Sequence, residues 1–215
     1  MSIKIRLIIM NFLQFAVWGA YLTSMGSYLV NVGLHEHIGM FYAMQGIVSL
    51  FMPAVLGIIA DRWIPAQKLL SFSHFTAALF MAAAGYYGMT KGADVDFGTL
   101  FTLYSLSVAF YMPTLALSNS VAYTALDKAG LDTIRTFPPI RIFGTIGFIC
   151  SMWVVDLLGL QNNYGQFFAC AIIGVAYGVY ALTLPECPTS KGDNAKSLVE
   201  ALGLRAFTLF KHCLL

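Results

Sequence analysis

Three side chains of different chemistry share one stripe of the apolar segment that follows the double proline Pro138-Pro139. Arg141, Thr145 and Phe148 are spaced i, i+4 and i+7, so they lie on one face if the segment is a helix. The stripe combines a charge, a hydroxyl and an aromatic ring, which can donate hydrogen bonds and stack. A cation on an apolar helix predicts a functional site if that helix crosses a membrane.

The residues alone leave a second interpretation of Arg141 open. If the helix begins at Pro138, Arg141 lies only about one turn inside it and could extend its guanidinium to the headgroups of the membrane surface. Thr145 could likewise satisfy a helical carbonyl, and Phe148 could face lipid.

Composition identifies the class of protein. Of the 215 residues, 59% are hydrophobic and 10% are charged, and the mean hydropathy is +0.75. Soluble domains carry about 25% charged residues, so the sequence predicts an integral membrane protein. A net charge of +2 gives no reason to expect a nucleic-acid partner, and the four cysteines show no zinc-type spacing. No phosphate-binding loop or hydrolase motif is found, so we expect no enzyme.

Charged residues divide the chain into six apolar spans of about 20 residues or more. The predicted spans lie within Ile5–Val32 and Ile38–Ala60 and then cover about Gln67–Tyr87, Phe97–Ala125, Pro138–Leu158 and Tyr164–Leu184. The first is too long for a cleavable signal peptide. The predicted domains are a six-helix bundle over residues 1–185, a cytoplasmic linker over 186–197, and a truncated start of a seventh helix over 198–215.

The basic residues predict the orientation. Eight of them fall at the N-terminus or in alternate loops, namely Lys4, Arg6, Arg62, Lys68, Lys128, Arg135, Lys191 and Lys196. The opposite loops hold only Lys91. The positive-inside rule therefore predicts a multi-pass membrane protein with a cytoplasmic N-terminus. The spacing of the spans also suggests two triplets of helices, the 3+3 inverted arrangement of half a transporter.

A short motif follows the second span. Gly57, Asp61 and Arg62 form Gly-x-x-x-Asp-Arg, which resembles the signature of the major facilitator superfamily at this loop. The resemblance implies a conformational gate, although Trp63 stands where the superfamily continues with glycine. An interfacial turn with a tryptophan anchor is the alternative.

Longer blocks narrow the resemblance to one family. Phe12–Leu22, Met52-Pro53-Ala54, Ala109–Leu115 and above all Phe137–Phe148 resemble the nucleoside:proton symporters of that superfamily. The match runs in order along essentially the whole chain. It implies an all-α fold, the N-terminal half of a twelve-helix carrier, with the C-terminal half as its expected partner.

The same resemblance assigns roles. It implies that Arg141, Thr145 and Phe148 contact the nucleoside, through donors to its carbonyl and hydroxyl groups and by stacking on its base. It implies a proton as coupling ion and no other cofactor, with the coupling carboxylate in the other half. Two competing functions stay open: a carrier of another polar solute such as a sugar, and a non-transporting six-helix membrane protein.

Several other polar residues are weaker candidates. Asn11, Gln14, Trp18 and Tyr21 form a stripe in the first span that could line a cavity or bond to other helices. His35-Glu36-His37 has no further ligand nearby, so no metal site is expected. His74 is expected to be a packed residue rather than a proton relay.

Overall fold

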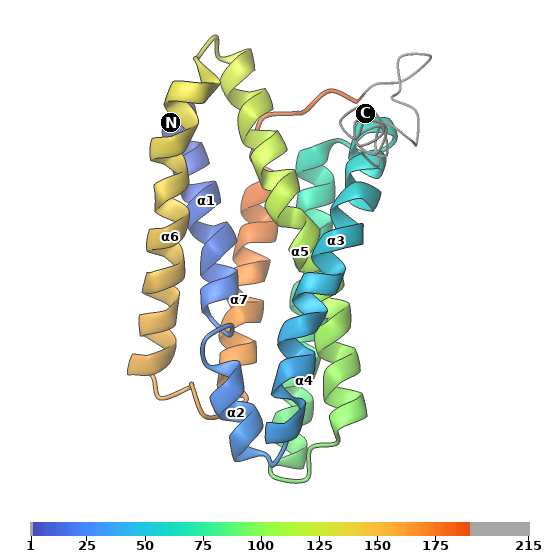
Figure 1. Cartoon of the computed structure of the whole chain (residues 1–215). Helices are drawn as coiled ribbons and strands as arrows, with labels where there is room; N and C mark the ends of the chain where they lie inside the picture. Colours follow the sequence, from blue (N-terminus) through green and yellow to red (C-terminus); the bar gives the residue numbers. More distant parts are fainter. Residues whose placement is uncertain (1, 190–215) are drawn as a thin grey trace, which may run out of the picture.

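The computed structural model describes residues 2–189, and every regular element in that range is helical (Figure 1). The elements are α1 (Ile3–Gly19), α2 (Met25–Asn31), the 3-10 turn η1 (His35–His37), α3 (Ile38–Arg62), α4 (Ala66–Lys91), α5 (Phe97–Lys128), α6 (Thr133–Leu157) and α7 (Gly165–Ala181). The expected seventh helix at 198–215, and most of the expected linker at 186–197, lie outside the described residues.

The helices have the length and composition of membrane spans. The segments His35–Arg62, Ala66–Lys91, Phe97–Lys128 and Thr133–Leu157 are each long and apolar enough to cross a bilayer, and α7 is a shorter apolar helix. Together α1 and α2 cover the first predicted span. The predicted all-α bundle of six spans is therefore confirmed, with the first span divided in two.

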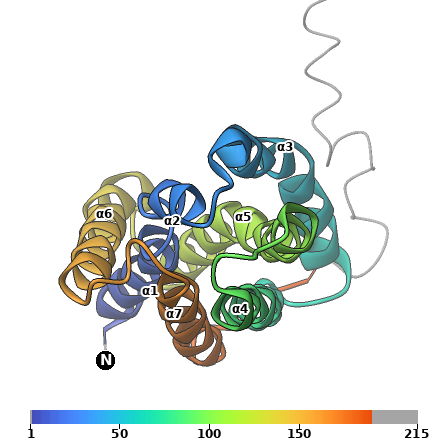
Figure 2. The ribbon, with the colours of Figure 1, turned by 90° about the horizontal axis from the view of Figure 1, so that it is seen from below.

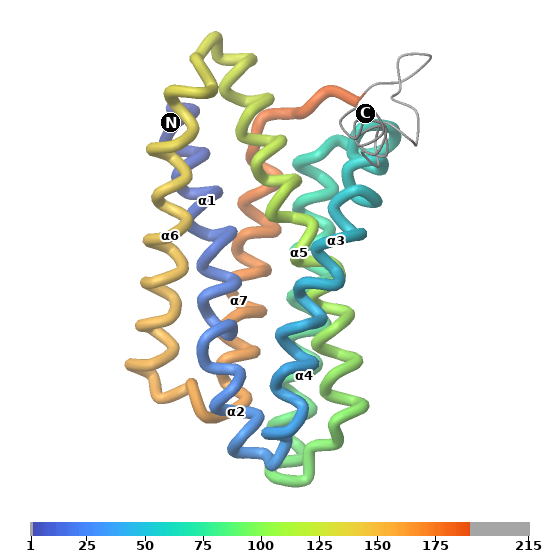
Figure 3. The backbone as a smooth tube through the Cα atoms, viewed as in Figure 1, coloured from blue at the N-terminus to red at the C-terminus, as the bar shows by residue number. Residues whose placement is uncertain are grey.

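The interruption of the first span falls at residues 20–24, between α1 and α2 (Figure 3). One backbone group in the break has a side-chain partner, since the hydroxyl of Tyr42 on α3 donates to the carbonyl of Leu22 at 2.8 Å. The hydroxyl of Ser24 donates to Oε1 of Gln166 on α7 at 3.1 Å. Non-helical backbone inside a membrane requires hydrogen-bond partners. The helical periodicity of the sequence does not indicate which residues of other helices supply them.

The fifth span begins earlier than predicted. The expected start was Pro138, but α6 begins at Thr133 and both prolines lie inside it. The carboxylate of Asp132 accepts hydrogen bonds from the backbone N–H groups of Ile134 and Arg135, at 3.0 and 3.3 Å, and so caps the helix. Both prolines therefore lie near the start of α6. A proline has no N–H to donate to the carbonyl four residues earlier, and here those carbonyls belong to the first, exposed turn of the helix.

The larger contacts between helices keep their pattern when the two triplets are exchanged, whereas the small contacts α5–α6 and α3–α4 have no counterpart of similar size. The exchange pairs α1 with α5, α3 with α6, and α4 with α7. The close pairs α1–α6 and α3–α5 then replace each other, as do α4–α5 and α1–α7, while α4–α7 and α1–α5 map onto themselves. Figure 2, seen along the bundle, shows α6 and α3 on opposite sides of α1 and α5. This is the contact pattern of a 3+3 repeat.

Candidate functional site

Glycines on α1 and α6 allow the predicted stripe of Arg141, Thr145 and Phe148 to lie beside α1. A Cβ at Gly147 would clash with the backbone carbonyl of Phe12, and a Cβ at Gly19 would clash with the backbone carbonyl of Phe148. The two helices therefore approach closely at these glycines, as small residues allow in membranes. Arg141, Thr145 and Phe148 emerge along one side of this contact.

Arg141 stacks on an aromatic ring of α1. Its guanidinium carbon lies 3.7 Å from the centroid of the Phe15 ring, within the range of a cation–π contact. Arg141 is half-buried and lies eight residues after Thr133, about 12 Å along the helix axis from its start. A start at Pro138 would have put it only about one turn inside, so Arg141 lies further along the helix than expected, and its role in binding stays a prediction.

Trp18 connects the two aromatic ends of the site. Its ring meets Phe15 at a centroid distance of 6.2 Å and meets Phe148 edge-on at 6.1 Å. Its indole N–H donates to Oε1 of Gln45 on α3 at 2.8 Å, and the amide of Gln45 donates to the hydroxyl of Tyr104 at 2.8 Å. The indole is therefore held by α3 and α5 while its ring packs between the aromatic residues of α1 and α6.

The structure thus brings two of the three predicted residues into one aromatic group. Arg141 and Phe148 are joined through Phe15 and Trp18, while Thr145 lies exposed on α6 between them in sequence. Phe15 was not predicted, because no spacing within one helix relates it to Arg141. The only sequence signal was its place in the block Phe12–Leu22.

Gln14 has a different role from Trp18, although both belong to the stripe of the first span. Gln14 is fully buried, and its amide nitrogen lies 2.8 Å from Oγ1 of Thr114. The hydroxyl of Thr114 donates its only proton to the carbonyl of Tyr111. Gln14 must therefore be the donor to Thr114, which leaves its Oε1 as an acceptor.

This assignment also defines the state of His74. Nε2 of His74 lies 3.2 Å from Oε1 of Gln14, so Nε2 donates its proton to that oxygen, and Nδ1 has no hydrogen-bond partner among the described residues. The tyrosine rings of Tyr111 and Tyr177 pack edge-on against the imidazole. His74 is a packed residue that ties α4 to α1, as the sequence suggested.

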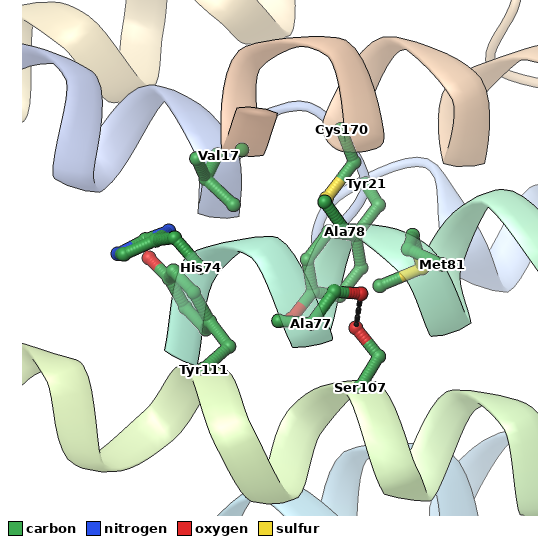
Figure 4. A pocket seen from close by; sticks show the side chains of 10 residues that line it. Val17, Tyr21, His74, Ala77, Ala78, Met81, Ser107, Tyr111 and Cys170 are labelled. Atoms are coloured by element: carbon green, nitrogen blue, oxygen red, sulfur yellow. Dashed lines mark hydrogen bonds between the residues drawn. The ribbon is translucent and has the colours of Figure 1, made fainter. Parts of the chain in front are cut away.

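A small cavity of about 10 Å³ is lined in part by His74 (Figure 4). Tyr21, Tyr111 and Cys170 contribute to its wall, and Ser107 next to it donates to the carbonyl of Ala77 at 2.8 Å. This volume holds about one water molecule, whereas pockets for small-molecule ligands are about 300–1,000 Å³. This cavity is therefore too small for such a ligand, and the face of Arg141, Trp18 and Phe148 stays the candidate ligand site.

The three predicted gate residues lie at the end of α3. Asp61 is exposed and Arg62 is half-buried at the last turn. A Cβ at Gly57 would meet no heavy atom of the described residues within 4 Å. The close helix approach that would demand glycine is therefore not seen in this conformation, and the gate stays a prediction.

No group of three or more His, Cys, Asp or Glu side chains within residues 2–189 is arranged to hold a metal ion. His37 instead stacks on Phe97 with ring centroids 4.1 Å apart. The His35-Glu36-His37 segment is a short 3-10 turn that contacts the start of α5 through His37.

Comparisons with known proteins agree with the fold and the blocks of sequence. The profile of the family described as nucleoside H+ symporter matches residues 1–215. The xanthosine permease of Escherichia coli K12 is 42% identical over 217 residues, which cover 99% of this chain and 50% of that protein. The nucleoside permease NupG of the same organism is 41% identical over 216 residues, with 99% and 50% covered.

A solved structure gives the same result. The crystal structure of a point variant of the nucleoside transporter NupG superposes with a TM-score of 0.88 at 39% identity, covering 98% of this chain and 51% of that one. The chain spans about half the length of the curated relatives it matches. These relatives are permeases rather than enzymes, and on this evidence the chain is a multi-pass membrane protein that belongs to the nucleoside H+ symporter family.

Proposed function

We propose that this chain forms one half of a carrier that moves nucleosides across the bacterial inner membrane together with protons. Membership of the family and the names of its relatives support a nucleoside as the substrate. The complete carrier would alternate access by rocking two six-helix bundles around a site at their interface. The second bundle would correspond to the part of the relatives that this chain does not cover.

Arg141, Thr145 and Phe148 would supply this half's contacts to the nucleoside. The observation that carries this proposal is the guanidinium of Arg141 held 3.7 Å over Phe15, beside the edge-on pair Trp18–Phe148. A nucleoside is neutral and flat, and it presents carbonyl and hydroxyl oxygens. The guanidinium and Thr145 would donate to these oxygens, and the ring of Phe148 would stack on the base.

The remaining parts of the mechanism follow the same proposal. The N-terminus would be cytoplasmic, so Gly57, Asp61 and Arg62 would lie at the cytoplasmic gate. The proton would be the only coupling ion. His74 is bonded to Gln14 in the packed interior, so we assign it a structural role, and the proton-binding carboxylate would belong to the second half.

A chimaeric carrier tests the proposal. This chain would replace the matching half of NupG in cells that lack nucleoside uptake, and entry of labelled uridine would be measured. We expect uptake that adenosine competes and glucose does not. The substitution Arg141→Ala should abolish uptake without lowering the amount of folded carrier.

Arg135→Ala provides the matched control, since Arg135 lies on the same helix but its side chain is almost fully exposed. Competition by glucose and not by adenosine would contradict the nucleoside assignment. Equal uptake by the Arg141 and Arg135 variants would contradict the assigned role of Arg141.

A further inference from the structure

A groove lies between α1 and α6, near the ends at which both helices begin. It has a volume of about 250 Å³, and its wall is formed by Lys4, Ile8, Arg135, Thr136, Pro139, Ile140 and Phe143. The groove therefore combines two basic side chains with an apolar floor.

This groove is separate from the stripe of Arg141, Thr145 and Phe148, which is called the nucleoside stripe below. Pro139 and Phe143 are both two residues away from Arg141, which is about 200° around a helix. The nucleoside stripe and the groove thus flank the contact between α6 and α1 on opposite sides. No group assigned to nucleoside binding takes part in the groove.

Apolar side chains around the groove are exposed as expected for a surface in contact with lipid. Phe143 is 37% exposed within the groove, and Ile142 next to it is 60% exposed. Ile134, one residue before Arg135, is 86% exposed. Two cations therefore stand at the end of an apolar surface, which is the position of lipid headgroups relative to their acyl chains.

The charges favour an anion. Lys4 lies in the first turn of α1, whose N-cap residue Ser2 makes no side-chain hydrogen bond to the helix, and the N-terminal end of a helix itself favours an anion. Within residues 2–189, the carboxylate paired with these cations is that of Asp132, which lies 3.5 Å from Nε of Arg135. Both side chains of this pair are largely exposed, and such pairs are weak enough for a phosphate to compete with them.

We propose that this groove binds the phosphate headgroup of an anionic phospholipid, with Lys4 and Arg135 on the phosphate and one acyl chain along Ile8 and Phe143. The groove is open on the side of α6 that faces away from the nucleoside stripe, so a lipid can enter it from the bilayer. Basic pockets between membrane helices are established sites for such headgroups. This inference does not depend on the nucleoside as substrate.

The experiment measures lipid retention by the full 215-residue chain in detergent. Native mass spectrometry would record how much phosphatidylglycerol or phosphatidylcholine stays bound after each is added in equal amounts. We expect several-fold more phosphatidylglycerol than phosphatidylcholine on the unchanged chain. The double variant Lys4→Gln/Arg135→Gln should lose this preference.

Two further variants separate the groove from charge in general. Lys68→Gln/Lys91→Gln removes the same charge from two exposed positions outside the groove and should keep the preference. Thr136→Trp leaves every charge in place and fills the groove, so it should reduce phosphatidylglycerol retention. Thr136→Trp also keeps the basic residues that orient the chain in the membrane.

Three results would overturn the proposal. Equal loss of preference in both double variants would mean that only net charge matters. Unchanged retention in Thr136→Trp would mean that the lipid binds elsewhere. Binding of inorganic phosphate that needs Lys4 and Arg135, and that displaces no phosphatidylglycerol, would make the groove a site for free phosphate.

Discussion

The guanidinium of Arg141 on α6 lies 3.7 Å from the centre of the Phe15 ring on α1. The face of the Phe15 ring attracts the positive charge of the guanidinium, which stabilises this half-buried side chain inside an apolar bundle. It also fixes the direction in which the donors of the guanidinium can meet a ligand. The site is therefore made by a pair of helices and not by α6 alone.

The first prediction concerns Phe15. Replacing it by leucine keeps an apolar side chain but removes the ring, so the guanidinium should lose its orientation. A cation–π contact contributes about 0.5–2 kcal/mol, so uridine affinity in the chimaeric carrier should fall about two- to thirtyfold. Phe72→Leu on α4, where the ring is largely exposed, should leave affinity unchanged. Unaltered affinity in Phe15→Leu would contradict the positioning role.

A second prediction concerns Thr145, which is exposed on the same stripe. Valine has nearly the same shape without the hydroxyl. Thr145→Val should leave the thermal unfolding midpoint in detergent unchanged and weaken uridine binding by about 0.5–1.5 kcal/mol, the net contribution of one hydrogen bond. A lower unfolding midpoint with unchanged binding would show that the hydroxyl serves the helix and not the ligand.

The third prediction tests the close contact of α1 and α6. A methyl group at Gly147 would meet the backbone carbonyl of Phe12, which cannot move aside as a side-chain end could. Gly147→Ala should therefore destabilise the bundle by about 1–3 kcal/mol. Gly46→Ala on α3 would meet no described heavy atom within 4 Å and should be neutral or stabilising. Thermal unfolding of the two variants in detergent gives the comparison.

A fourth prediction addresses the buried polar group around Gln14. Gln14→Leu leaves Thr114 and His74 buried without this partner, so the chain should lose about 1–3 kcal/mol of stability. His74→Phe should also destabilise it. The double variant should lose clearly less than the sum of the two, because both changes remove one shared hydrogen bond. Full additivity would mean that the two residues act independently.

The fifth prediction is a pH dependence at the start of α5. Asp96 accepts hydrogen bonds from the backbone N–H and the hydroxyl of Thr99, and these bonds hold the pKa of its carboxyl below the ordinary value. A lowered folded pKa stabilises the fold when the group is ionised, so this stability is present above the ordinary pKa of about 4 and is lost as pH falls below it.

Asp96→Asn should accordingly lower the unfolding midpoint at pH 7, and the difference from the unchanged chain should shrink as pH falls through the folded pKa. Asp94→Asn is the control, since Asp94 lies in the same loop but the helix cap is Asp96. A difference that is constant with pH would exclude the charged cap as its cause.

Much of the fold could be predicted from the sequence, because the patterns involved are local. Apolar length and the placement of charges predict six spans, and the helices at α3, α4, α5 and α7 begin and end within a few residues of the predicted bounds. The spacing of Arg141, Thr145 and Phe148 already indicates one face of one helix. The blocks of residues that resemble the symporter family predict the membership that the comparisons establish.

What the sequence by itself determined is therefore the membrane class, the helices and the face of α6 that carries polar chemistry. Only the tertiary structure decided which residues from other helices complete that face. Phe15 and Trp18 meet α6 because glycines allow its backbone to approach α1, and Gln14 points instead to His74 and Thr114. The break after α1 and the start of α6 at Thr133 likewise depend on hydrogen-bond partners. Helical periodicity indicates which residues share a face of one helix. It does not indicate which other helix that face contacts, because this depends on how all the helices pack.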